Sequence, residues 1–293
     1  MKEKVTSLQV AVKEMDYFTA KDKLMVDQEI SMMKNVYETV RKSTSSSQFL
    51  HVVQLLGFFK DEENGKGYIV LEYCSKGDLR KYIEDMKRTR TEITPKLAYE
   101  MISQIASSLN QLHASGIIHA DLKPENVLLV EGFKVKLADF GLARQLQVGR
   151  EYTTNHGGTL LYQGPEILSN RIFTEGGKAK TKMNVKVKAK VQVQNSPQKI
   201  AQTTCADIWA FGVMIFELLA QHHPFFDSTS EGNILTEEFI NRVVNLPPLE
   251  LPEHYPLKLK NLIIQMLNKD PSKRVQASDI LKIPEVAATF VNN

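Results

Sequence analysis

The spacing of hydrophobic and polar residues changes along the chain, and each change predicts a different element. Leu8 to Lys13 alternates apolar and polar positions, which is typical of a half-buried strand. Lys21 to Val36 has the spacing of a helix. Two further strands, His51 to Phe59 and Tyr68 to Tyr73, are predicted on either side of a turn at Asn64-Gly65. The predicted helix gathers its apolar residues on one side: Leu24, Ile30, Met33 and Val36.

The later part of the chain has mainly helical patterns. Pro95 to His113 carries apolar residues at helical spacing, and Thr94-Pro95 is a favourable start. Val213 to Leu219 is almost entirely apolar, which is typical of a buried helix. Two shorter helices are predicted near the end, at Leu257 to Leu267 and Ala277 to Ile283.

Composition and charge narrow the class of protein. The 293 residues are 42% apolar, which suits one large or two modest globular domains. The formal net charge of +3 is too small to indicate a nucleic-acid or membrane partner. Cys74 and Cys205 are far apart, so neither a disulfide framework nor a zinc site is predicted. Without a signal-type segment or an apolar run that could cross a membrane, we expect an intracellular, cytoplasmic protein, with a nuclear location left open.

The strongest candidate chemistry lies near the middle of the chain. His119-Ala120-Asp121-Leu122-Lys123-Pro124-Glu125-Asn126 is followed by Asp139-Phe140-Gly141. Asp121 is suited to accept the proton of an attacking hydroxyl. Asn126 and Asp139 offer the oxygen ligands preferred by Mg²⁺ ions that bridge phosphates. The residue types and their order therefore indicate phosphoryl transfer.

The same segment resembles the catalytic loop and metal-binding motif of the eukaryotic protein kinases, H-R-D-L-x-x-x-N and D-F-G, with Ala120 in place of the arginine. The resemblance covers nearly the whole chain and implies an α+β, two-lobed fold, with ATP and Mg²⁺ as cofactors and proteins as substrates. It implies a single domain over residues 1–293. Residues 1–73 would form a small lobe of antiparallel sheet and one helix, and residues 74–293 a larger, mainly helical lobe.

The resemblance also implies a nucleotide site. Lys13 would contact the α- and β-phosphates, and Glu29 of the following helix would fix its position through an ion pair. The segment from Glu72 to Leu79 resembles the hinge that binds adenine in this family. Four further residues are expected to contact the nucleotide: Ala11, Glu72, Cys74 and Leu128.

Two positions favour Ser or Thr as the acceptor of the phosphoryl group. Lys123 lies two residues after Asp121, as in Ser/Thr-directed kinases, where this lysine steadies the transferring phosphoryl charge. Thr159 matches the threonine of the G-T-x-x-Y-x-x-P-E segment, whose hydroxyl bonds to the catalytic aspartate and lysine. The catalytic residues expected from the resemblance are Asp121, Lys123, Asn126 and Thr159, and the expected metal ligands are Asn126 and Asp139.

Other positions of the family pattern concern support, regulation and specificity. By resemblance, Asp207 holds the backbone of the catalytic loop, and Arg274 forms a buried pair with Glu166. Kinases with the arginine use it to bind an activation-loop phosphate, so Ala120 predicts that activity depends little on phosphorylation of Thr153 or Thr154. A weak preference for basic substrates is expected from three carboxylates that stand where some relatives contact arginine: Asp78, Glu125 and Glu217.

The N-terminal region departs from the family pattern. Only twelve residues precede Lys13, and none of them is glycine, so the G-x-G-x-x-G loop is missing. Either the chain lacks the loop, or the sequence begins at an internal methionine of a longer protein. Each lost amide contact to a phosphate is worth about 1.5 to 3 kcal/mol. The leading hypothesis is ATP-dependent phosphorylation of Ser/Thr hydroxyls on proteins. The alternatives are a pseudokinase that acts as a binding or scaffolding module, and a small-molecule phosphotransferase, which does not account for Thr159.

A basic insertion is predicted at about residues 171–203, because Glu166 and Asp207 are further apart than in the family. Within it, Met183 to Gln194 alternates strictly and is rich in lysine. Such a lone amphipathic strand has no predicted partner strand. The insertion is read either as a solvated loop or as a docking element for an acidic partner.

Overall fold

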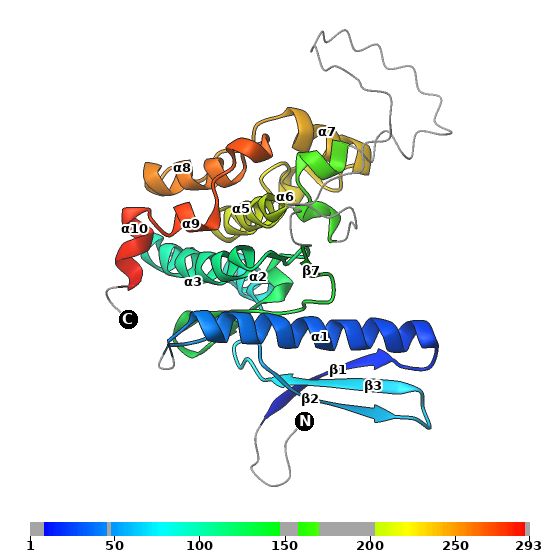
Figure 1. The fold of residues 1–293 in the computed structure, drawn as a ribbon. Helices are drawn as coiled ribbons and strands as arrows, with labels where there is room; N and C mark the ends of the chain where they lie inside the picture. Colours follow the sequence, from blue (N-terminus) through cyan, green and yellow to red (C-terminus); the bar gives the residue numbers. More distant parts are fainter. Residues whose placement is uncertain (1–8, 46–47, 147–157, 170–202, 291–293) are drawn as a thin grey trace.

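The computed structural model describes residues 9–45, 48–146, 158–169 and 203–290 (Figure 1). The predicted residues Thr153 and Thr154, and nearly all of the basic insertion, lie outside these ranges. The N-terminal part is an antiparallel sheet in the order β1-β3-β2, with one long helix across it. Its elements are β1 (Val10–Asp16), α1 (Ala20–Ser43), β2 (Leu55–Asp61) and β3 (Lys66–Glu72).

Helix α1 begins at a capping box and is longer than the sequence pattern predicts. Thr19 caps it, because its hydroxyl accepts from the backbone N of Asp22 (3.1 Å) while the Asp22 carboxylate accepts from the backbone N of Thr19 (2.9 Å). The helix continues to Ser43 because Val40 extends the buried stripe by one turn. The prediction for Leu24 was wrong, since this side chain is 57% exposed. The stripe that packs inward is Val26, Ile30, Met33, Val36 and Val40.

The segment before β2 links the sheet to the rest of the molecule. The predicted strand at 51–59 is divided, because its first residues leave the sheet. Val52 instead forms a parallel bridge with Leu137, and the backbone N of Val53 donates to the carbonyl of Leu137 at 2.9 Å. In the sheet itself, β1 pairs with β3 so that Lys13 stands opposite Ile69. This register fixes the position of Lys13 on β1, an edge strand of this sheet, beside the central strand β3.

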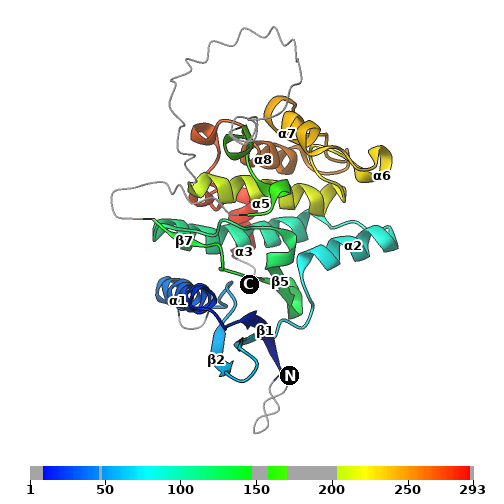
Figure 2. The ribbon, with the colours of Figure 1, turned by 90° about the vertical axis from the view of Figure 1, so that its right-hand side faces the viewer.

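The C-terminal part consists mainly of helices, with short two-stranded pairs at its boundary with the sheet (Figure 2). Strand β4 pairs with β7 and β5 with β6, in both cases antiparallel. The α-helices and strands are α2 (Leu79–Thr89), α3 (Pro95–Ala114), β4 (Ile117–Ile118), β5 (Val127–Val130), β6 (Lys134–Leu137), β7 (Arg144–Gln145), α5 (Thr204–Ala220), α6 (Ser228–Glu231), α7 (Thr236–Asn245), α8 (Leu257–Met266), α9 (Ala277–Ile280) and α10 (Pro284–Ala287). Short 3₁₀ helices are η1 (Pro124–Asn126), η2 (Glu131–Phe133), η3 (Leu160–Tyr162), η4 (Pro271–Lys273) and η5 (Ala288–Phe290).

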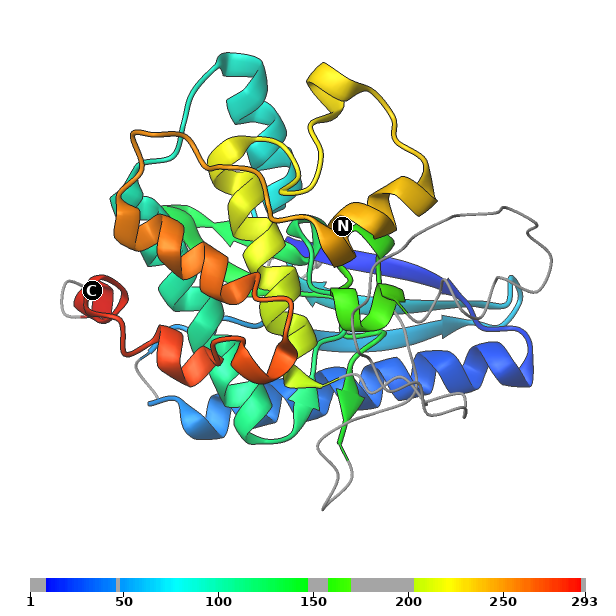
Figure 3. The ribbon, with the colours of Figure 1, turned by 90° about the horizontal axis from the view of Figure 1, so that it is seen from above.

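Helix α5 forms the centre of the helical part (Figure 3). It packs against both α3 and α8, and its residues from Ala206 to Leu219 are all buried. This burial explains the continuous apolar run in the sequence, because a helix surrounded by other helices needs no polar face. Trp209 is fully buried and stacks on Phe225 with ring centroids 5.8 Å apart. No helix in the described ranges is long and apolar enough to cross a membrane.

The side chain of Arg274 joins three segments near the start of α5. It is fully buried and forms a two-pronged ion pair with Glu166, at 2.8 Å from Nη1 to Oε1 and 3.0 Å from Nη2 to Oε2. Nη1 also donates to the carbonyl of Cys205 (2.7 Å) and Nε to the carbonyl of Asn268 (3.0 Å). The segment after η3 is therefore held against α5 and α8 by one guanidinium.

We expect Arg274→Met to lower the free energy of unfolding by about 3 to 5 kcal/mol, because it leaves the Glu166 carboxylate without this partner. The neighbouring Lys273→Met is the matched control, since the Lys273 side chain is 73% exposed and its ion pair is within its own turn, with Asp270. That control should change stability by no more than about 0.5 kcal/mol. Denaturant unfolding of the two variants measures both values, and equal losses would contradict the prediction.

Candidate active site

The loop from His119 to Asn126 is held by a buried carboxylate at the start of α5. Asp207 is 1% exposed, and its oxygens accept from the backbone N of His119 and of Ala120, both at 2.9 Å. It also bonds to Nε2 of His113 at 2.8 Å. Burial by itself raises the pKa of Asp207, but the hydrogen bond and charge of His113 outweigh it and lower the pKa below its ordinary value. The carboxylate therefore stays ionised.

Ala120 shows why the loop needs this support. Its φ of 67° lies in the left-handed region, which costs an alanine about 1 to 2 kcal/mol. The bond from its N to Asp207 holds it there. Gly158 has a φ of 99°, and a Cβ at this position would lie 2.5 Å from the carbonyl oxygen of Ala120. Only glycine allows the segment that carries Thr159 to approach the loop so closely.

The carboxylate of Asp121 accepts hydrogen bonds from the other three residues expected to be catalytic. Its Oδ1 accepts from the backbone N of Thr159 (2.9 Å) and from the Thr159 hydroxyl (3.0 Å). Its Oδ2 lies 2.8 Å from Lys123 Nζ and accepts from Asn126 Nδ2 at 3.1 Å. Lys123 Nζ also donates to Thr159 Oγ1 at 3.0 Å. Because an ionised carboxylate only accepts, an incoming hydroxyl would replace one of these donors.

Lys13 connects the sheet to the segment after β6. Its Nζ lies 2.7 Å from Glu29 Oε1 on α1 and 3.2 Å from Asp139 Oδ1. Burial lowers the pKa of Lys13, but the bonds and charges of Glu29 and Asp139 raise it above its ordinary value. Burial likewise raises the pKa of Asp139, and Lys13 more than offsets this, so the pKa is lowered. Lys13 and Asp139 are therefore charged at neutral pH, and the predicted Lys13–Glu29 pair is present.

The oxygens of Asn126 and Asp139 suit a hard cation. Asn126 Nδ2 is committed to the carbonyl of Asp121 (2.8 Å) and to its carboxylate, which leaves the Asn126 carbonyl oxygen to coordinate. Asp139 is ionised and its side chain is 44% exposed. No cluster of three His, Cys, Asp or Glu side chains in the described ranges could hold a metal by itself. One carboxylate and one amide oxygen are ligands of the kind that Mg²⁺ takes together with water and phosphate oxygens.

The residues expected around adenine are only partly brought together. Cys74 and Leu128 share a small apolar cluster with Val53 and Ala138, against which Leu71 packs. Ala11 stands opposite Leu71 in the β1–β3 pairing. Glu72 uses its carboxylate structurally: Oε1 accepts from the backbone N of Gln54 (2.7 Å) and pairs with Lys136 (2.8 Å). Burial raises the pKa of the Cys74 thiol to about 11, so this cysteine is a packing residue rather than a nucleophile.

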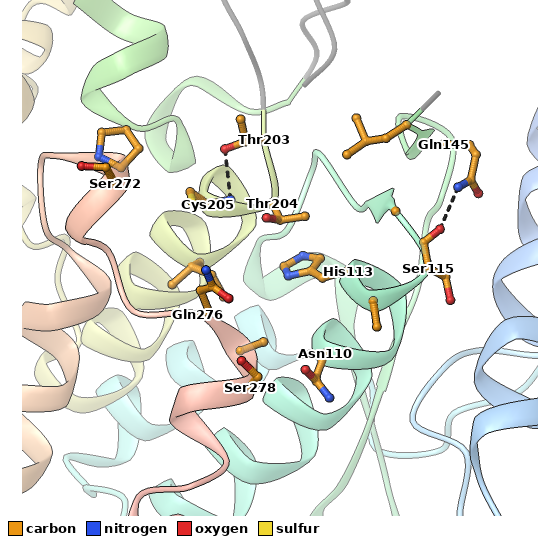
Figure 4. A pocket seen from close by; sticks show the side chains of 16 residues that line it. Asn110, His113, Ser115, Gln145, Thr203, Thr204, Cys205, Ser272, Gln276 and Ser278 are labelled. Atoms are coloured by element: carbon orange, nitrogen blue, oxygen red, sulfur yellow. Dashed lines mark hydrogen bonds between the residues drawn. The ribbon is translucent and has the colours of Figure 1, made fainter. Parts of the chain in front are cut away.

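A cavity of about 880 Å³ lies between the end of α3, β7, the start of α5 and α9 (Figure 4). Its wall includes His113, Ser115, Gln145 and Thr203, and none of the described residues that line it is a carboxylate, lysine or arginine. None of the predicted site residues lines it. His113, which bonds to Asp207, is a supporting residue that sequence reasoning missed, because no local pattern distinguishes it from other polar residues on α3.

His223 supports the segment that carries Thr159 through hydrogen bonds of its ring. Its Nε2 donates to the carbonyl of Leu161 (2.9 Å), and its Nδ1 accepts from the backbone N of Phe225 (3.2 Å). With one nitrogen donating and the other accepting, the ring must be neutral. Burial lowers the pKa of His223 to about 4, in agreement with this arrangement.

Comparison with known proteins gives one family. The sequence profile of the protein kinase domain matches residues 1–181 and 194–285. The chain is 29% identical over 255 residues to serine/threonine-protein kinase Nek3 of Mus musculus, covering 86% of this chain and 42% of that protein. It is 32% identical over 238 residues to serine/threonine-protein kinase ULK3 of Homo sapiens (80% and 42%) and 28% identical over 286 residues to the Aurora kinase of Schizosaccharomyces pombe (97% and 65%). The chain thus spans less than two thirds of the length of each of these relatives.

We expect the fold to lose stability as the pH falls from about 6.5 to about 4, the ordinary and the folded pKa of His223. The folded pKa is depressed, so this contribution is fully present above about 6.5 and lost as the unfolded chain takes up the proton. His223→Gln should flatten the wild-type curve by up to about 3 kcal/mol, since one pKa unit is about 1.4 kcal/mol. Urea denaturation of both proteins across this pH range measures the difference, and parallel curves would refute the assignment.

Proposed function

Because this chain belongs to the protein kinase domain family, we propose that it transfers the γ-phosphoryl group of ATP to Ser or Thr hydroxyls of protein substrates. The observation that carries the proposal is the hydrogen-bonded set of Asp121, Lys123 and Thr159. Such a set holds a proton acceptor, the Asp121 carboxylate, and a cation, Lys123, at the same point, as phosphoryl transfer to an alcohol requires.

In the proposed reaction, Asp121 orients the acceptor hydroxyl and takes its proton. The hydroxyl oxygen forms a bond to the γ-phosphorus while the bond from phosphorus to the ADP oxygen breaks. Lys123 stands 2.8 Å from Asp121 and offsets the charge on the transferring group. Thr159 keeps both side chains in place, and its position beside the lysine supports Ser or Thr rather than Tyr as the acceptor.

The nucleotide would be held from the opposite side. Lys13, positioned by Glu29 at 2.7 Å, would contact the α- and β-phosphates. Asn126 and Asp139 would bind Mg²⁺, which supplies positive charge against the phosphate oxygens. The adenine would lie against the apolar side chains of Ala11, Cys74 and Leu128, and the backbone at Glu72 and Cys74 would bond its edge.

The remaining features fit an intracellular protein of this kind. We propose that residues 1–293 form a single domain whose lobes meet near residue 73. Residues 182–193 fall between the two matched segments, within the predicted basic insertion. Its lysines would suit an acidic protein partner. Cys74 and Cys205 are free thiols, as is usual in a reducing compartment.

Labelled phosphate transfer from Mg-ATP to a generic Ser/Thr substrate tests the proposal. Asp121→Asn and Asp139→Asn should each reduce the rate by about 10²- to 10⁴-fold, since one removes the proton acceptor and the other a metal ligand. Asp279→Asn is the matched control, because this exposed carboxylate on α9 pairs with Lys282 one turn away on the surface. The control should retain the wild-type rate.

A wild-type rate no higher than that of Asp121→Asn at millimolar ATP would overturn the proposal. The fold would then serve as a binding or scaffolding module, the pseudokinase alternative. Thermal-shift measurements of nucleotide binding by the same proteins, with and without Mg²⁺, then separate a module that still binds ATP from one that does not.

A further inference from the structure

A second charged cluster lies beside the candidate active site, and one guanidinium fills its centre. Arg80, on α2, donates from Nε to Glu125 Oε1 (3.0 Å) and from Nη2 to Glu217 Oε2 (3.2 Å). The same Nη2 donates to the hydroxyl of Tyr162, which in turn donates to Glu217 Oε2 at 2.5 Å. Two carboxylates and a phenol thus converge on a single arginine side chain.

The cluster is attached directly to the catalytic loop. Glu125 belongs to η1, between Lys123 and Asn126, and Tyr162 ends η3, three residues after Thr159. Glu217 lies on α5, the helix that also carries Asp207. A peptide whose hydroxyl reached Asp121 would therefore pass close to this cluster.

Burial within the cluster is uneven. Glu217 is 7% exposed and Tyr162 is buried as well, so they form the floor. The Arg80 side chain is 26% exposed and that of Glu125 45%, so they form an open rim. Burial raises the pKa of Glu217, and Arg80 acts against this. Burial opposes the charge of Arg80, but Glu217, Tyr162 and Glu125 outweigh it and raise its pKa. The guanidinium is therefore permanently charged.

This donor and acceptor set is that of an arginine-binding pocket, because planar guanidinium groups pair with carboxylates in two-pronged geometry. The chain supplies the arginine itself. We propose that Arg80 closes this pocket to arginine side chains of peptides, so that the substrates of the proposed kinase lack arginine at the position facing Glu125. This proposal rests on the proposed function, because only a kinase would have such peptides as substrates. It reverses the weak preference for basic substrates expected from the sequence.

Binding of labelled peptides, measured by fluorescence anisotropy, tests the pocket without requiring catalysis. The peptides carry one arginine at successive positions before a serine, and in the paired set citrulline, its neutral isostere, replaces the arginine. Arg80→Met should bind the arginine peptide about tenfold or more tightly than the citrulline peptide at one position, as expected for a charged hydrogen-bonded pair.

Arg88→Met is the matched control, because it removes the same charge from the same helix, and the Arg88 side chain is 73% exposed and pairs with Asp85 on its own helix. Wild type and this control should discriminate less than about threefold, as surface charges do. Equal binding of the two peptides by Arg80→Met, or a wild-type preference as large as that of the variant, would overturn the proposal. Transfer assays with the same peptides judge the proposed function separately, since the binding result holds whether or not phosphate is transferred.

The variant Arg80→Lys guards against loss of folding in Arg80→Met. It keeps a positive charge opposite the buried Glu217, but a lysine lacks the planar fork. We expect it to give an intermediate preference for arginine, together with a melting temperature close to that of wild type. If Arg80→Met is unfolded at the assay temperature and Arg80→Lys discriminates no better than wild type, the proposal fails.

Discussion

The bonds of the Asp207 carboxylate are the constraint on which the candidate site depends. This one side chain accepts from two consecutive backbone N–H groups, at His119 and Ala120, and so fixes a loop that includes a left-handed alanine. The carboxylate is in turn fixed because it belongs to α5, which is buried along almost its whole length. The position of Asp121 is thus set by the packing of the helical core, and only its fine adjustment is left to Thr159 and Lys123.

The second support of the site runs through the sheet. Lys13 is placed by the pairing of β1 with β3, and Glu29 by the capped helix that crosses the sheet. Asp139, which adopts a φ of 57°, meets Lys13 from the C-terminal side. Asp139 is the residue of these three that belongs to the helical part, and its ion pair with Lys13 holds it to the N-terminal part. A shift of α1 would separate Glu29 from Lys13 and change the charge balance at Asp139, even if the catalytic loop stayed in place.

The sequence predicts much of this arrangement where motif and periodicity act locally. The helices around α3 and α5 follow from continuous apolar stripes, and the contacts of Lys13, Asp121 and Thr159 agree with the resemblance on which they were expected. Predictions failed where tertiary contacts decide the outcome. Leu24 fits the helical stripe yet is exposed, because the side of α1 that packs inward is the one that carries Val26, Ile30 and Met33. Val52 reads as part of a strand in the sheet, but it bonds to the segment at Leu137 instead.

Charges that pair over long sequence separations are the least predictable feature, and they decide the chemistry of both clusters. Arg80 is 45 residues from Glu125 and 137 from Glu217, and the sequence offers no signal that one helix surface arginine will cross to these carboxylates. Lys13 and Asp139 are also far apart, at 126 residues, but unlike Arg80 and its partners they belong to motifs that the sequence makes recognisable. In physical terms the two cations do the same work, because each opposes the rise in pKa that burial causes at one carboxylate: Lys13 at Asp139 and Arg80 at Glu217. What separates them is the neighbouring chemistry: Lys13 pairs with Asp139, the proposed metal ligand, whereas Arg80 would border the path of a peptide to Asp121 in the proposed reaction.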